Sequence, residues 1–157
     1  MIGLHGVGKT SLVRRYAQSI FTHDYLPTLG VQISKKSVES NGRTVVFTLW
    51  DLAGDEERQH LQDAYLSHAA AYILVADVSR IVSLDHAKVL QRRIQLLLPQ
   101  APFALALNKA DLTEREIGEA ELAQLDPSWR VITTSAHTGQ GVEELFTLLA
   151  DRILKRR

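Results

Sequence analysis

Glycine, lysine and threonine near the start of the chain are spaced as in loops that bind phosphate groups. Residues 3–10 read Gly-Leu-His-Gly-Val-Gly-Lys-Thr and fit the pattern G-x-x-x-x-G-K-[ST]. In such a loop backbone N–H groups surround a diphosphate at a helix N-terminus, the lysine offers a positive charge to the β- and γ-phosphates, and the threonine hydroxyl binds Mg²⁺. A glycine-rich turn before an amphipathic helix is the alternative. The predicted phosphate-contacting residues are Gly3, His5, Gly6, Val7, Gly8, Lys9, Thr10 and Ser11.

A second candidate lies where an alternating apolar segment ends, at Asp51 and Gly54. An aspartate in this place reaches Mg²⁺ through water, and a glycine N–H meets a γ-phosphate without steric hindrance. A strand-ending aspartate followed by a turn glycine has the same sequence. The pair therefore indicates a metal site only in combination with the phosphate loop.

Two further polar segments follow apolar runs and predict a site for a nucleotide base. Asn108, Lys109 and Asp111 come after the run 103–107, and Ser135, Ala136 and His137 come after 131–134. A carboxylate at Asp111 accepts from the ring N–H and the exocyclic amine of guanine, whereas adenine offers no such pair of donors on that edge. Backbone N–H groups of the second segment would hold the same base. The predicted ligand is therefore a guanine nucleotide.

The elements that position these residues alternate between strand and helix, which predicts an α/β fold of the doubly wound kind. We expect a six-stranded mixed sheet with one antiparallel edge strand and about five flanking helices. Segments 31–39 and 43–50 flank Asn41-Gly42, a dipeptide typical of a tight hairpin turn. Further strands are predicted over 71–76, 103–107 and 131–134. Helices are predicted to begin around Leu12 and to cover 84–97, 113–125 with Thr113 as its cap, and 142–153.

Composition limits the classes that remain. The 157 residues suit one domain over 1–157, and 18 basic against 18 acidic side chains leave no field that would attract nucleic acid. With no cysteine there is no disulfide scaffold, thiolate zinc site or lipid attachment through cysteine. The longest apolar run, 69–76, is far shorter than the roughly 20 residues of a membrane span. We therefore expect a cytoplasmic protein without a lipid anchor in this chain.

The order of the motifs along the whole chain resembles the Ras superfamily of small GTPases. Trp50-Asp51, Leu29-Gly30-Val31 and Asp77-Val78-Ser79 look more like Rab-type members than like Ras itself. The resemblance implies a P-loop NTPase fold and a switch that binds GDP or GTP with Mg²⁺ and hydrolyses GTP. It also implies an effector that binds the two switch segments, an exchange factor and an activating protein.

Individual roles follow from the same resemblance. Thr28 matches the switch residue that holds Mg²⁺ and the γ-phosphate, Phe21 the aromatic that packs on guanine, and Tyr25 the tyrosine that covers the phosphates. Asn108 and Asp111 would read the base, Lys109 would lie along the nucleotide, and Ala136 would donate its N–H to the guanine carbonyl. The implied metal ligands are Thr10, Thr28 and Asp51, and the implied catalytic residues are Lys9, Thr28 and Asp55.

Two positions depart from the family pattern and predict slow hydrolysis. Asp55 stands where a glutamine orients the attacking water, and two like charges 4 Å apart repel by roughly 4 kcal/mol at an effective dielectric near 20. His5 stands where Ras has a glycine. Compensation between His5 and Asp55 is the contrary hypothesis, with the histidine as donor and Asp55 polarising the water. A guanine-nucleotide-binding scaffold with little hydrolysis and a P-loop small-molecule kinase are the alternative functions.

The effector surface and the chain start also differ from the family pattern. Trp50 and Tyr65 match two of three effector-facing Rab aromatics, whereas Ile33 replaces the first, so the two aromatics either contact an effector or only pack the hairpin. Only Met1 and Ile2 precede Gly3, where the family has a full central strand. We expect several apolar residues before Met1, in a longer polypeptide, or another segment in that place.

Overall fold

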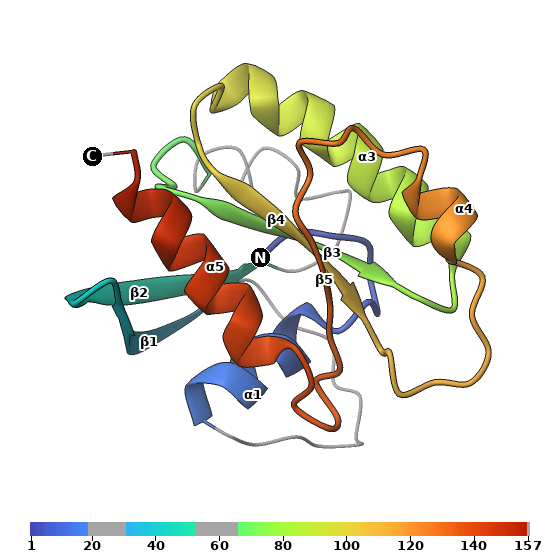
Figure 1. The fold of residues 1–157 in the computed structure, drawn as a ribbon, viewed down its shortest axis with the longest axis horizontal. Coiled ribbons are helices and arrows are strands. Elements are labelled where there is room, and N and C mark those ends of the chain that lie inside the picture. Colours follow the sequence, from blue (N-terminus) through green and yellow to red (C-terminus); the bar gives the residue numbers. More distant parts are fainter. Residues whose placement is uncertain (19–30, 53–65, 157) are drawn as a thin grey trace.

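The computed structural model describes residues 1–18, 31–52 and 66–156, and every structural statement below concerns these residues. Helices and strands alternate along most of the chain, as the sequence predicts (Figure 1). In chain order the elements are α1 (Lys9–Gln18), β1 (Val31–Ser40), β2 (Arg43–Leu52), β3 (Tyr72–Asp77), α3 (Ile81–Leu97), β4 (Phe103–Asn108), α4 (Glu119–Leu122), β5 (Val131–Thr133) and α5 (Val142–Leu154).

The strands form two groups. β1 and β2 pair antiparallel from Val31↔Leu52 to Ser40↔Arg43, and both turn residues have positive φ, 52° at Asn41 and 70° at Gly42. This confirms the predicted hairpin. β3, β4 and β5 form a parallel sheet in that order, so the polar residues that follow β3 and β4 meet at one edge.

Helices cover both faces of the parallel sheet (Figure 1). All six residues of β3 are therefore buried. Ile73 and Val75 pack in one apolar cluster with residues of α1 and α5, whereas Tyr72, Leu74 and Ala76 pack in another with α3. The alternation follows from the two-residue period of a strand. In the described ranges no helix is both long and apolar enough to cross a membrane.

Six strands are not confirmed, because the described residues hold five. Near the position that the family pattern gives to a central strand, Ile2 forms a single parallel bridge with Leu74, and the main-chain nitrogen of Met1 donates to Trp50 O at 2.8 Å. A cavity of about 520 Å³ lies beside these contacts, lined by Met1, Ile2 and residues of β2, β3 and α5. That a further apolar segment fills this place stays a prediction.

The helix predicted over 113–125 is wrong in extent. Only Glu119–Leu122 is helical, and its N-cap is Gly118 rather than Thr113. The N–H groups of Glu116 and Ile117 both donate to Val78 O, at 2.9 and 3.0 Å, so this stretch is tied to the end of β3 instead of forming helical turns. The Glu121 carboxylate accepts from the Gly118 N–H at 2.8 Å, which fixes the later start.

Candidate functional site: phosphate loop and base loops at the sheet edge

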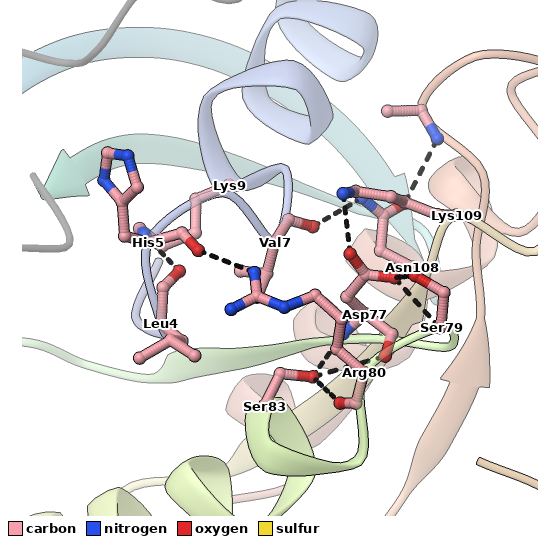
Figure 2. Close-up of polar contacts among 11 residues, drawn as sticks. Leu4, His5, Val7, Lys9, Asp77, Ser79, Arg80, Ser83, Asn108 and Lys109 are labelled. Atoms are coloured by element: carbon pink, nitrogen blue, oxygen red, sulfur yellow. Dashed lines mark hydrogen bonds and ion pairs between the residues drawn. The ribbon is translucent and has the colours of Figure 1, made fainter. Parts of the chain in front are cut away.

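The predicted phosphate loop leads directly into α1. Lys9, 7% exposed, donates from Nζ to the carbonyl of Gly3 at 3.0 Å and to that of Leu4 at 3.1 Å, so its side chain folds back over its own loop. Figure 2 shows the contact with Leu4. Gly8 has φ 96°, and a Cβ there would lie 2.3 Å from Asn108 Nδ2. A side chain at position 8 would therefore collide with the base-side residue that packs on the loop.

The two predicted metal ligands Asp51 and Thr10 meet beside this loop. Thr10 Oγ1 donates to Asp51 Oδ2 at 2.5 Å, and the other carboxylate oxygen is buried without a hydrogen-bond partner among the described residues. Burial raises the pKa of Asp51, although the Thr10 hydrogen bond opposes this. A buried carboxylate next to a hydroxyl, with one oxygen unsatisfied, fits a divalent cation, which would supply the missing positive charge.

Asn108 joins the phosphate loop to the predicted base loop. Its side chain is 1% exposed; Nδ2 donates to Val7 O at 2.9 Å and Oδ1 accepts from the Ala136 N–H at 3.2 Å. Thr134 Oγ1 donates to the same oxygen at 3.3 Å. Val7 itself is fully buried in the core, so it offers only its backbone to a ligand. Asn108 thus fixes the two loops relative to each other, and its predicted contact with the base, like that of Ala136, stays a prediction.

Asp111 lies beside Ser135 and His137, so the structure brings together the two segments that we expect on the base side. Ser135 Oγ donates to Asp111 Oδ1 at 2.5 Å, and His137 Nδ1 lies 3.2 Å from Oδ2. The Ser135 hydrogen bond, with a smaller effect from His137, holds the pKa of Asp111 below its usual range. The carboxylate is therefore ionised at neutral pH and acts only as an acceptor.

Lys109 pairs with a residue that was not among the predicted site residues. Its Nζ lies 2.6 Å from Oδ2 of Asp77, which is completely buried at the end of β3 (Figure 2). Ser79 also donates to this carboxylate, through its N–H at 3.0 Å and its hydroxyl at 2.7 Å. Burial alone would raise the pKa of Asp77, but the contacts with Lys109 and Ser79 outweigh it and lower the pKa.

We expect Lys109→Met to lower the free energy of unfolding of the nucleotide-free protein at pH 7 by about 2 kcal/mol, because the buried Asp77 loses its partner. In wild type the pair stabilises the folded protein fully above about pH 4, which is the pKa of an aspartate in the unfolded chain. This stabilisation is lost as the pH falls toward the lower pKa of Asp77 in the folded protein. Urea unfolding between about pH 3 and pH 7 measures both effects.

The matched control is Lys88→Met, which removes an exposed ion pair with Asp85 of 3.1 Å. We expect it to change stability by less than about 0.5 kcal/mol and to keep the wild-type pH dependence. An equally steep loss of stability on acidification in Lys109→Met and in wild type would contradict a stabilising role of the Lys109–Asp77 pair.

Two arginines also brace the site and were not predicted. Arg15 of α1 donates through Nε to Ala136 O at 2.7 Å and also donates to the carbonyl of His137. Arg80, after β3, donates through Nη1 to His5 O at 3.1 Å. No spacing in the sequence identifies either arginine, because each bridges segments that the chain order keeps far apart. The predicted residues Phe21, Tyr25, Thr28, Gly54 and Asp55 lie outside the described residues.

Comparison with known proteins agrees with this arrangement of loops. The sequence model of the Ras family matches residues 1–155. Ras-related protein RABF2a of Arabidopsis thaliana is 34% identical over 157 residues, which cover 98% of this chain and 78% of that protein. Ras-related protein Rab-12 of Mus musculus is 34% identical, and the match covers 99% of this chain and 66% of that protein. GTP-binding protein YPT1 of Saccharomyces cerevisiae is 31% identical, and the match covers 98% of this chain and 76% of that protein. The chain therefore belongs to the Ras family.

Proposed function

We propose that GDP or GTP lies along the sheet edge, with its phosphates in the loop 3–11 and its guanine between residues 108–111 and 135–137. As a Ras-family member, the chain is a GTP-binding molecular switch and hydrolyses GTP. The main support for this residue assignment is the Asn108 side chain, which is hydrogen-bonded to Val7 on the phosphate side and to Ala136 on the base side. These hydrogen bonds hold the phosphate loop and the base loop at a fixed distance, which is needed if the phosphates and the base of one nucleotide are to bind both loops at once.

Thr10 and Asp51 would hold Mg²⁺, together with Thr28. The unsatisfied Asp51 oxygen and the adjacent Thr10 hydroxyl support this assignment. When bound, Mg²⁺ neutralises charge on the β- and γ-phosphate oxygens.

Hydrolysis would proceed by in-line attack of water on the γ-phosphate. Lys9 and the loop N–H groups would stabilise the charge that develops on the phosphate oxygens. Asp55 would face this charge with a carboxylate in place of an amide, and His5, whose side chain is exposed on the loop, would occupy space near the attacking water. Both changes support hydrolysis at or below the small-GTPase scale of about 10⁻⁴ s⁻¹.

We expect His5→Gly and Asp55→Gln each to raise the single-turnover rate of GTP hydrolysis, Asp55→Gln by about tenfold or more because it removes like-charge repulsion. The double variant should be at least as fast as the better single variant. Rates below wild type in both single variants would instead indicate that His5 and Asp55 act as a compensating pair.

Family members act through effectors, exchange factors and activating proteins, and the outer face of the β1–β2 hairpin is the proposed effector surface. Ile33 and Trp50 are cross-strand partners there and are 55% and 40% exposed. Trp50 directly precedes Asp51, a proposed Mg²⁺ ligand, in β2, and this supports a contact of the exposed apolar pair that depends on the nucleotide state. The partner would then shift the population between the two states.

The test of the proposed function is identification by mass of the nucleotide that co-purifies with the protein. We expect GDP or GTP, and we expect GTP to displace it far better than ATP. Preferential binding of ATP would favour a small-molecule kinase and overturn the proposal. GTP that co-purifies and stays unhydrolysed over several days, far longer than the slow hydrolysis expected here, would favour a scaffold.

A further inference from the structure

Arg80 is held rigidly at the start of α3. Its N–H donates to Asp77 O at 3.0 Å, and its own carbonyl accepts from Ser83, through the N–H at 3.0 Å and the hydroxyl at 2.6 Å. Ser83 is completely buried, and its hydroxyl oxygen also accepts from the Asp77 N–H at 2.8 Å. The backbone from which the arginine side chain extends is therefore fixed by the end of β3.

From this anchor the guanidinium reaches the phosphate loop (Figure 2). Arg80 Nη1 donates to His5 O at 3.1 Å and lies 3.6 Å from the point that a Cβ on Gly6 would occupy. The positive group therefore contacts the outer side of the peptide bond between His5 and Gly6. Arg80 is half-buried, and its contact spans 75 residues of sequence.

The orientation of this peptide bond decides where the next N–H points. In a trans peptide the C=O of one residue and the N–H of the next point in opposite directions. Because the His5 carbonyl points toward Arg80, the Gly6 N–H points away from Arg80. Gly6 has φ 78°, and a glycine after the peptide unit allows the peptide plane to flip, through ψ of His5 and φ of Gly6, at little steric cost. A contact from outside the loop can therefore select one orientation.

We propose that Arg80 is a positioning residue of the nucleotide site, which holds the His5 carbonyl outward and thereby directs the Gly6 N–H at the phosphates of GDP or GTP. This inference rests on the proposed function and adds to it a residue outside the phosphate-loop motif. The gain is pre-organisation: an N–H already aimed at the phosphate needs no rearrangement when the nucleotide binds.

The test compares Arg80→Met with wild type in two quantities, the affinity for nucleotide and the NMR chemical shift of the Gly6 amide proton. We expect the Kd for GDP and for a non-hydrolysable GTP analogue to rise about tenfold, the range for loss of a hydrogen bond to an ionised group. In ¹H–¹⁵N NMR spectra we expect GDP to move the Gly6 amide proton downfield in wild type but much less in the variant. The unfolding midpoint of the nucleotide-free protein should change by less than about 2 °C.

Two further variants keep the test decisive. Arg80→Lys retains a charged donor without the forked guanidinium, so we expect an intermediate Kd, and this variant carries the test if Arg80→Met does not fold. Arg92→Met removes the same charge from an exposed position of α3 and should behave as wild type. Wild-type affinity together with a wild-type Gly6 shift in Arg80→Met would overturn the inference, as would weaker affinity with an unchanged Gly6 shift. Absence of GDP binding in wild type would instead overturn the proposed function.

Discussion

Asp111→Asn is expected to lose GDP affinity by a factor of at least about 10³ and to gain affinity for xanthosine diphosphate. Guanine presents a ring N–H and an exocyclic amine on the edge that Asp111 would face, and an ionised carboxylate accepts from both. An asparagine amide has one acceptor and one donor group, so its donor would oppose the guanine amine. Xanthine carries a carbonyl in place of that amine, which restores complementary pairing.

The surroundings of Asp111 explain why the effect should be large. Ser135 holds one carboxylate oxygen at 2.5 Å and lowers its pKa, so the group is fixed in position and charge before any ligand arrives. Asparagine in the same position retains the shape but not the charge. The loss of affinity therefore reports on base recognition and not on collapse of the loop.

Competition between GDP and xanthosine diphosphate, measured by displacement of a fluorescent nucleotide, gives the two affinities directly. Asp126→Asn is the matched control: Asp126 also accepts a hydrogen bond within an exposed turn, from the Ser128 N–H at 2.8 Å, but is not among the proposed base contacts. It should keep the wild-type preference for GDP. A preference for GDP retained by Asp111→Asn would show that another group reads the base.

Local sequence patterns predicted a helix or strand correctly where the apolar residues of the pattern are the ones that the fold buries. Leu12, Val13 and Tyr16 are the buried face of α1, and the Asn41-Gly42 dipeptide forms the hairpin turn. The pattern failed over 113–125 because main-chain groups of Glu116 and Ile117 bond across to Val78, and a helical period carries no information about such a contact.

The same distinction separates the parts of the site that could be predicted from those that could not. Asn108 and Asp111 were predicted as site residues because a buried apolar run leads into them in a recognisable order, and Asn108 is the last residue of β4. Arg15 and Arg80 were missed because their contacts depend on the direction of one long side chain across 121 and 75 residues. Asp77 was noted only as part of a Rab-like segment, and its pairing with Lys109 required the register of β3 against β4.

Lys9→Met is expected to raise the Kd for GDP by about 10³ and for a GTP analogue by more. At about 4 Å and an effective dielectric near 20, a unit charge pair is worth roughly 4 kcal/mol, which corresponds to about three powers of ten in affinity. Lys9 is 7% exposed, so water screens its charge weakly. Lys88→Met removes the same charge from α3, where Lys88 pairs with Asp85 and touches no proposed nucleotide contact, and should bind GDP as wild type does.

The structure allows a second explanation of such a loss, and the experiment must separate the two. Because Lys9 also donates to Gly3 O and Leu4 O, its removal leaves two carbonyls without their donor and could distort the loop even if the ammonium never touched a phosphate. A charge effect grows with the number of phosphates, whereas a distorted loop weakens GDP and GTP binding equally. Titration calorimetry with GDP and a GTP analogue therefore decides: we expect the analogue to lose more affinity than GDP, and equal losses would assign Lys9 to bracing the loop alone.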